Sequence, residues 1–432
     1  MLSAWMDRLA FIFLCLLIAV LPVSKAGVEI CAAAAILFFL GKKTFLFFRG
    51  QGAWGQRIAL PAPVPALLYS LLIFSLATLL SVVMSHFPAL SWRAFLGKTL
   101  QAVLLFLVVQ EVLTSTERVR RIAGVFLITA AVVAVDAGWQ MVFGQDFFRG
   151  LASEYGRLTA SFKHPNSLGS YCMAVLPLAF IWLRRTWAQR KGCWGSILSG
   201  ILFVALLVVM LMIYSRSAWT GAVVAFVVLA WLDRRLRRFL LLGIFLLLIV
   251  LPFVFMQGRN FASGAGSFTS AQELSRIDGG MWQTLTRDNS RFIYWSDALR
   301  ILRDNPVWGA GLNTYARVIR QYSELDQAYP HNCYLQMAAE LGVAGVLAFF
   351  YLLFQIFRMA GLRLASKTSF DPQWTHAFLA AFAGLCVQSF FDTTLYSSQL
   401  APLFWLLAGL VVVGAGTALS PGQSNSVPEG SA

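Results

Sequence analysis

Apolar segments long enough to cross a membrane recur along the whole chain, and they limit its fold more than any other feature. A helix needs about 20 apolar residues to span a bilayer core. Runs that approach this length lie near residues 8–24, 26–41, 62–85, 93–113, 122–143, 167–183, 196–214, 217–232, 239–256, 333–357, 374–391 and 399–418. The sequence therefore predicts an all-α polytopic integral membrane protein with about twelve transmembrane helices.

The composition supports this class. Of 432 residues, 59% are hydrophobic and only 12% are charged, which leaves more apolar surface than a soluble fold can bury. The six cysteines lie mostly inside apolar runs and form no CxxC pair, so we expect buried thiols instead of disulfides or metal ligands. The first run follows Arg8 and ends in small residues around Ala26, as signal peptides do, and its removal would leave the remaining topology unchanged.

Lysine and arginine are concentrated in alternate connections between the apolar runs. By the positive-inside rule these connections face the cytoplasm, which places both termini there. The net charge of +15 then reflects topology and contact with anionic membrane lipids, and it implies no nucleic-acid partner. The basic connections contain Lys42, Lys43, Arg49 and Arg57; Arg118, Arg120 and Arg121; Arg184, Arg185, Arg190 and Lys191; Arg234, Arg235, Arg237 and Arg238; and Arg358, Arg363 and Lys367.

The chain divides accordingly into four parts. Residues 1–256 hold the first nine predicted spans and a short outer loop near 144–166, and residues 257–332 form a large outer loop. Residues 333–418 hold the last three spans, and residues 419–432 form a flexible cytoplasmic tail. The large loop opens with a Gly/Ser-rich lead-in, which indicates an adaptable segment.

Two amphipathic helices are predicted in the second half of the large loop. Apolar and charged residues alternate there at helical spacing, which is typical of a helix lying on the outer leaflet. A second, weaker pattern spans residues 312–323. In the first helix, the apolar face comprises Phe292, Trp295, Ala298, Leu299 and Leu302, and the opposite face comprises Arg291, Asp297, Arg300 and Arg303.

Several basic residues on the outer side require an explanation. Arg216 stands between two closely joined apolar runs, where a charge is costly unless an anionic group pairs with it; the alternative is a snorkelling or salt-bridged hairpin residue. Arg291 lies on the amphipathic helix, whose polar face alone would also account for it. The outer ends of other spans are lined by Arg93, Lys98, Arg157, Lys163 and His164. If these groups converged, they would hold a doubly charged pyrophosphate, for which arginine is suited by its bidentate donors.

His331 is the candidate reaction centre. It precedes Asn332 where the large loop enters the tenth apolar run, and an imidazole fixed at a membrane surface can act as a general base. Pro330 is expected to occupy the first turn of that helix and to hold the imidazole near the membrane rim. The alternative is that His331 only caps the helix.

We expect no metal and no cofactor. The outer acids form no D-x-D motif, and the pair Glu324 and Asp326 is the nearest approach to an oxygen-ligand site for Mg or Mn. A solvated loop is the preferred interpretation of that pair. Arginine would then neutralise the charge that a metal neutralises elsewhere.

Three motifs together resemble the O-antigen ligase and polymerase superfamily. They are SRSA at residues 215–218, RDNSRFIYWSDALRILRDNPVWGAGLNTY at 287–315 and PHNCYLQMAAELGVAGV at 330–346. The resemblance implies a membrane glycosyltransferase of the type C fold, acting on the periplasmic side of the bacterial inner membrane on a glycan linked to undecaprenyl pyrophosphate. In the ligase the acceptor is a sugar hydroxyl of the lipid A-core. The paired arginines of the family would fall on Arg216 and Arg291, and its histidine on His331.

The residue types lead independently to the same chemistry. No nucleotide sugars are supplied outside the cytoplasm, so a transferase there needs a donor whose leaving group is already a lipid pyrophosphate. Arginines would stabilise the charge that develops on that group, and a histidine would take the proton of the acceptor hydroxyl. With one base and no carboxylate nucleophile, direct displacement with inversion is the simplest scheme.

Other functions remain open at the level of the sequence. A polymerase or a protein O-oligosaccharyltransferase of the same superfamily would share these residues and differ only in the acceptor. A transporter of lipid-linked glycans would instead need ionisable residues at mid-membrane. Asp136, Glu111 and Glu340 are the main charges within the spans, and no inverted repeat is apparent.

Overall fold

The computed structural model of the chain describes residues 1–50, 63–154, 156–189, 193–234, 288–323 and 329–413, together with a few single positions between 237 and 249. Across these ranges the regular structure is helical, apart from two isolated bridges in the short outer loop. The helices are α1 (Leu2–Val20), α2 (Lys25–Phe48), α3 (Pro63–Val83), α4 (Pro88–Ala94), η1 (Phe95–Leu100), α5 (Gln101–Val112), α6 (Thr116–Phe143), α7 (Pro165–Ala188), α8 (Cys193–Ile213), α9 (Arg216–Leu232), α12 (Asp288–Asp304), α13 (Tyr315–Val318), η2 (Ile319–Gln321), α14 (Cys333–Ala365), α15 (Pro372–Gln388), η3 (Thr394–Tyr396) and α16 (Leu400–Val412).

The prediction of a polytopic membrane protein is confirmed, whereas the count of twelve spans is not settled. Eight of the described helical segments are long and apolar enough to cross a membrane, with α4, η1 and α5 forming one of them. The predicted eighth, eleventh and twelfth spans correspond to the shorter helices α9, α15 and α16. Most of the ninth, at 239–256, lies outside the described residues, as do the lead-in at 257–287 and the tail at 419–432.

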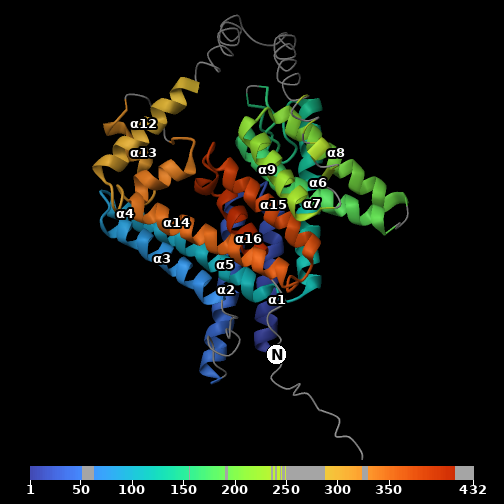
Figure 1. Cartoon of the computed structure of the whole chain (residues 1–432), viewed down its shortest axis with the longest axis horizontal. Helices are drawn as coiled ribbons and strands as arrows, with labels where there is room; N and C mark the ends of the chain where they lie inside the picture. The colour runs from blue at the N-terminus through green and yellow to red at the C-terminus, as the bar shows by residue number, and fades with distance from the viewer. Residues whose placement is uncertain are drawn as a thin grey trace, which may run out of the picture.

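The helices form two groups around α16. Helices α3, α5 and α14 lie on one side of it, and α7, α9 and α15 lie on the other (Figure 1). Ten consecutive residues of α16, from Leu403 to Val412, are buried. Close approach of α9 and α15 depends on glycine, because a Cβ at Gly221 would lie 2.9 Å from the carbonyl oxygen of Gly384. This packing fixes the start of α9 relative to the residues that follow α15.

Helix α14 is broken near its outer end at Gly342, which has φ of 67° and ψ of −171°. The segment between α12 and α13 occupies the break and pairs with the freed backbone groups. Ala310 N–H donates to the Ala339 carbonyl at 2.9 Å, and Val343 N–H donates to the Pro306 carbonyl at 2.9 Å. A Cβ at Gly342 would overlap the Val307 carbonyl, so only glycine fits there. We call this contact, between residues 306–315 and 339–344, the helix-break clamp.

Glu340 is the central polar group of the helix-break clamp. It is only 1% exposed, and its carboxylate accepts hydrogen bonds from Asn313 N–H at 2.7 Å and Tyr315 N–H at 3.2 Å. Gln336 Nε2 donates to the same carboxylate at 3.1 Å. A buried charge is tolerated when several donors compensate it. Glu340 therefore ties the outer loop to α14.

The short outer loop is held by two buried side chains of α6. The Asp136 carboxylate accepts from Phe147 N–H at 2.7 Å and from Ser161 Oγ. The Gln140 amide oxygen accepts from Thr159 N–H at 2.9 Å. Both residues lie within an apolar run but bind the loop backbone, so this loop has a defined conformation.

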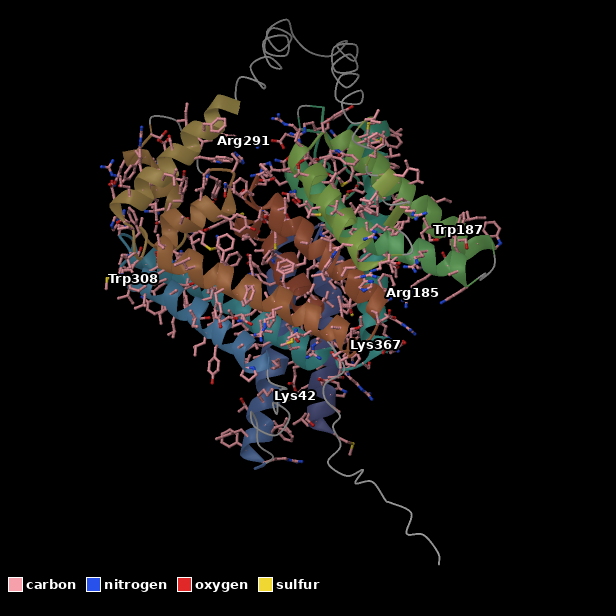
Figure 2. The ribbon with its side chains drawn as sticks, viewed as in Figure 1. Lys42, Arg185, Trp187, Arg291, Trp308 and Lys367 are labelled. Carbon is pink, nitrogen blue, oxygen red and sulfur yellow. The ribbon has the colours of Figure 1, made fainter. Side chains whose placement is uncertain are left out.

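Charged residues gather at two opposite ends of the molecule. Figure 2 shows Lys42, Arg185 and Lys367 toward one end and Arg291 toward the other. The first end also holds compact ion pairs: Lys42 Nζ lies 2.9 Å from Asp7 and 3.0 Å from Glu111. This separation is the one that the positive-inside reading of the sequence predicts.

The predicted amphipathic helix exists as α12, and its buried side matches the predicted apolar face only in part: Ala298 is buried, and Trp295 and Leu302 are partly buried. Phe292 and Leu299 are 67% and 50% exposed, although both were expected on the apolar face. Asp297, expected on the polar face, is 2% exposed and bonds to Arg300 at 3.2 Å. The reason is that α12 packs on α14 and η2 through Ala298 and Ile301, a contact partner that periodicity does not reveal. The weaker second helix is confirmed as α13 and η2.

Candidate active site

His331 stands immediately outside α14 and does not cap it. The helix begins at Cys333, and its cap is Asn332, whose side-chain oxygen accepts from Tyr334 N–H at 3.0 Å and Leu335 N–H at 3.1 Å. The expectation that Pro330 occupies the first helical turn is therefore wrong. His331 has φ of 50°, in the left-handed region that is uncommon for residues other than glycine. Its side chain is 36% exposed, so the imidazole is held beside the helix and remains accessible.

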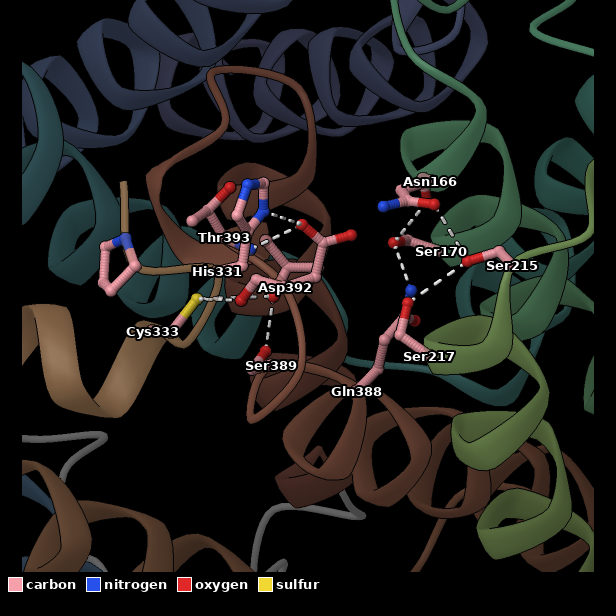
Figure 3. Close-up of polar contacts among 12 residues, drawn as sticks. Asn166, Ser170, Ser215, Ser217, His331, Cys333, Gln388, Ser389, Asp392 and Thr393 are labelled. Atoms are coloured by element: carbon pink, nitrogen blue, oxygen red, sulfur yellow. Dashed lines mark hydrogen bonds and ion pairs between the residues drawn. The ribbon is translucent and has the colours of Figure 1, made fainter. Parts of the chain in front are cut away.

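Asp392 is the acidic partner of His331, and sequence reasoning did not single it out. Its carboxylate Oδ1 lies 4.0 Å from His331 Nδ1. Asp392 is itself fixed by Thr393 N–H, which donates to Oδ1 at 2.7 Å, and by Cys333 Sγ, which donates to its carbonyl at 3.0 Å. Figure 3 shows the imidazole turned toward this carboxylate. The only signal in the sequence was an acid near the outer end of the eleventh run, a position shared by other outer acids.

Arg216 begins α9, beside a network of small polar side chains. Ser215 caps the helix by accepting from Ala218 N–H at 3.4 Å, and its hydroxyl donates to Asn166 Oδ1 at 3.0 Å. Tyr214 has φ of 51°, which turns the chain sharply before the cap. Arg216 is exposed at the helix start. Figure 3 shows the Asn166 and Ser215 side of this network next to the His331 and Asp392 side.

Arg157 is hydrogen-bonded on the Asn166 and Ser215 side of this network. Its Nε donates to the Ile213 carbonyl at 2.8 Å, and its Nη2 donates to Asn166 Oδ1 at 3.0 Å. Burial lowers the pKa of the Arg157 guanidinium, and the carboxylates of Glu154 and Asp392 act in the opposite direction. Arg157 thus reaches the loop before Arg216 and also lies within electrostatic range of Asp392.

Arg291 is brought toward the same end by the docking of α12. Trp295 Nε1 donates to the Pro330 carbonyl at 3.1 Å, and the Trp295 ring lies 5.6 Å from that of Phe390. Residues four apart on a helix share a face, so Arg291 projects from the α12 face that Trp295 places against the segment before His331. Arg291 is partly buried.

The two remaining basic candidates lie apart from this group. Lys98 Nζ donates to Asn313 Oδ1 at 2.6 Å and lies 5.9 Å from the Tyr396 ring, on the α4 and η1 side of the molecule. Lys163 is exposed in the turn before α7. The candidate metal pair, Glu324 and Asp326, falls outside the described residues.

The arrangement combines an accessible imidazole, an acid that faces its Nδ1 and guanidinium groups from separate elements. With Nδ1 directed at Asp392, Nε2 is left to exchange a proton with an incoming hydroxyl. Guanidinium groups are suited to bind phosphate oxygens through paired donors. The geometry therefore fits proton abstraction beside an anionic leaving group.

Comparison with known proteins agrees with the resemblance of the motifs. A search among curated proteins finds no match. Residues 201–350 match a protein-family model described as O-antigen ligase, and this stretch includes Arg216, Arg291, His331 and the helix-break clamp. The match covers about a third of the chain, and its description agrees with the resemblance of the motifs to the O-antigen ligase and polymerase superfamily.

Proposed function

We propose that the chain is an O-antigen ligase, which transfers a glycan from undecaprenyl pyrophosphate to a sugar hydroxyl of the lipid A-core at the periplasmic face of the inner membrane. The observation that carries the proposal is the His331 and Asp392 pair, with α12 docked beside it through the Trp295 bond to the Pro330 carbonyl. The family match supplies the class of reaction.

In the proposed reaction, His331 is the general base. Its Nε2 removes the proton of the acceptor hydroxyl while the acceptor oxygen forms a bond to the anomeric carbon. The bond between that carbon and the pyrophosphate oxygen breaks, and the pyrophosphate leaves with the bonding electrons. Arg216 and Arg291 bind the leaving group and stabilise its developing charge. Attack opposite the leaving group inverts the anomeric configuration.

Asp392 acts on His331 in this scheme. A carboxylate near Nδ1 favours the tautomer that carries its proton on Nδ1, in which Nε2 can accept a proton, and it stabilises the imidazolium formed after proton transfer. Arg157 balances the charge of Asp392 and supports the loop that carries Arg216. Asp392 and Arg157 are therefore positioning residues in the proposal.

A transporter is a poorer explanation of the same structure. Charges that serve a transport path face a water-filled cavity or exchange partners within the membrane. Here Glu111 pairs with Lys42 and Lys43, Asp136 binds a loop, and Glu340 holds the helix-break clamp. All three acids are engaged in structural contacts.

The acceptor distinguishes the ligase from its relatives. Purified protein is supplied with a lipid-linked glycan and, separately, with rough lipopolysaccharide, a second lipid-linked glycan or a pilin-like protein. Elongation of rough lipopolysaccharide supports the ligase, whereas elongation of the second lipid-linked glycan would identify a polymerase. Modification of the pilin would identify a protein O-oligosaccharyltransferase.

Activity that EDTA abolishes and Mg restores would contradict metal independence and make Glu324 and Asp326 ligand candidates.

The proposed orientation has its own test. A cysteine placed at Ser323 is expected to react with an impermeant thiol reagent from the periplasmic side, whereas a cysteine at Gln189 is expected not to react. Labelling with the opposite sidedness would place His331 on the wrong face of the membrane for this reaction.

A further inference from the structure

A cavity of about 480 Å³ lies among α2, α4, η1, α5, α14 and α16, and Tyr396 of η3 also lines it. Much of its lining is apolar and includes Phe74, Leu105, Met337, Leu341, Phe349 and Trp405. This volume lies within the range of small-molecule and cofactor sites, about 300 to 1,000 Å³. The lining is suited to hydrocarbon.

The outer part of the same cavity is polar and mainly basic. Lys98 and Arg93 line it, together with Asn313 and Tyr396, and Glu29 is the one carboxylate among its described lining residues. Asn313 fixes the Lys98 amine at 2.6 Å, and the Tyr396 ring lies 5.9 Å below it. Because Glu340 of the helix-break clamp accepts from Asn313 N–H, the position of Lys98 depends on the fold of the outer loop.

A second depression, of about 380 Å³, adjoins the cavity and adds more positive charge. The two share Leu90 and Arg93, and the depression also includes His86, Phe87 and Arg317. The Arg317 guanidinium lies over the Phe87 ring at 5.6 Å, which holds it at the edge. Within the described ranges, no carboxylate pairs with Arg93 or Arg317. Exposed cations next to an apolar cavity favour an anionic ligand that also carries a hydrocarbon chain.

We propose that the cavity and the adjoining basic depression bind one phosphate-bearing lipid. Its hydrocarbon lies in the apolar cavity, and its phosphate contacts Arg93, Lys98 and Arg317. The short segment from Asp392 to Tyr396 contacts both regions, because Asp392 faces His331 and the Tyr396 ring lies 5.9 Å from the Lys98 amine. Binding does not depend on the proposed ligase reaction, although that reaction requires two lipid substrates and would explain two sites.

The test measures lipid retention by the full-length protein, without any need for turnover. Protein in detergent is incubated with a polyprenyl pyrophosphate, with rough lipopolysaccharide or with phosphatidylglycerol, and bound lipid is counted by native mass spectrometry. Diacylglycerol serves as the neutral lipid. Comparing the retention of the three phosphate-bearing lipids shows whether the natural ligand is a glycan carrier, a phosphorylated glycolipid or a bulk membrane lipid.

The expected result is retention of at least one phosphate-bearing lipid, with affinity at least about tenfold weaker in Arg93→Ala/Arg317→Ala and in Lys98→Ala. Arg320→Ala is the matched control, because Arg320 is exposed on neighbouring η2 but lines neither hollow. Ala102→Phe, which fills the cavity, is expected to reduce retention as well. The basic side chains are exposed, so their variants decide the result if Ala102→Phe fails to fold.

Equal retention by the wild type and the basic-residue variants would overturn the proposal. Equal retention of diacylglycerol would do the same, because it would reduce the site to a nonspecific apolar surface. If the wild type shows no transferase activity but binds the phosphate-bearing lipid, and the basic-residue variants lose that binding, the ligase assignment is refuted and the lipid site is supported.

Discussion

Two sites at the start of α14, nine residues apart, are built in opposite ways: His331 lies just before the helix, and Glu340 lies within it. At Glu340 the helix-break clamp is buried, and its carboxylate and carbonyl accept bonds from Asn313, Tyr315 and Gly311. At His331 the imidazole is 36% exposed and stays 4.0 Å from its acid. The comparison indicates that the clamp fixes the large loop, while the segment around His331, which we call the rim, stays open to a substrate. Substitutions at the rim should change the reaction, and substitutions at the clamp should change the fold.

The largest effect is expected at the rim. His331→Ala should lower the transfer rate about a hundred- to ten-thousand-fold, because general-base assistance is lost, while the thermal unfolding midpoint and donor binding are retained. His376→Ala, near Arg184 and Asp233 at the other end of the bundle, is the control. Substantial turnover by His331→Gln would move the base elsewhere.

The arginines of the rim come next. Arg216→Ala and Arg291→Ala should each lower the rate about a hundred- to a thousand-fold, the range found when one stabilising donor is removed from a transition state. Lysine at either position keeps the charge but loses the paired donors, so it should recover only part of the rate. Steady-state transfer kinetics give the result. Full activity of a lysine variant would reduce that arginine to a general positive charge.

Substitutions in the helix-break clamp should lower the stability of the protein. Gly342→Ala is expected to destabilise the protein by at least about 2 kcal/mol, because a Cβ would adopt a left-handed φ and overlap the Val307 carbonyl. Thermal unfolding in detergent measures the loss. Gly361→Ala is the matched control: it lies in the same helix with no atom within 4 Å of the added Cβ, and it should be neutral or slightly stabilising. Equal melting of both variants would show that the clamp contributes no rigidity.

The smallest effect is expected at Asp392. Asp392→Asn should lower the rate about fivefold at most, because the His331 and Asp392 groups are 4.0 Å apart and such a long contact at a partly exposed imidazole contributes on the order of 1 kcal/mol. KM for the donor should stay unchanged, since Asp392 acts through His331. A loss as large as that of His331→Ala would give the carboxylate a direct part in the reaction and would weaken the contrast between the open rim and the closed clamp.

The sequence alone determined the membrane class, predicted an outer position for the motifs and identified His331, Arg216 and Arg291 as candidates. These follow from apolar run length, from the distribution of lysine and arginine, and from motif spacing, all of which are local along the chain. Tertiary structure decided the rest. Asp392 faces His331 across about 60 residues of sequence. Arg157 donates hydrogen bonds to Asn166 and to the Ile213 carbonyl. It does so from a loop that Asp136 and Gln140 hold. Helix α12 buries Asp297 and exposes Phe292 because its neighbours are α14 and η2. Periodicity shows that a helix has an apolar side, but only packing partners determine which residues that side contains.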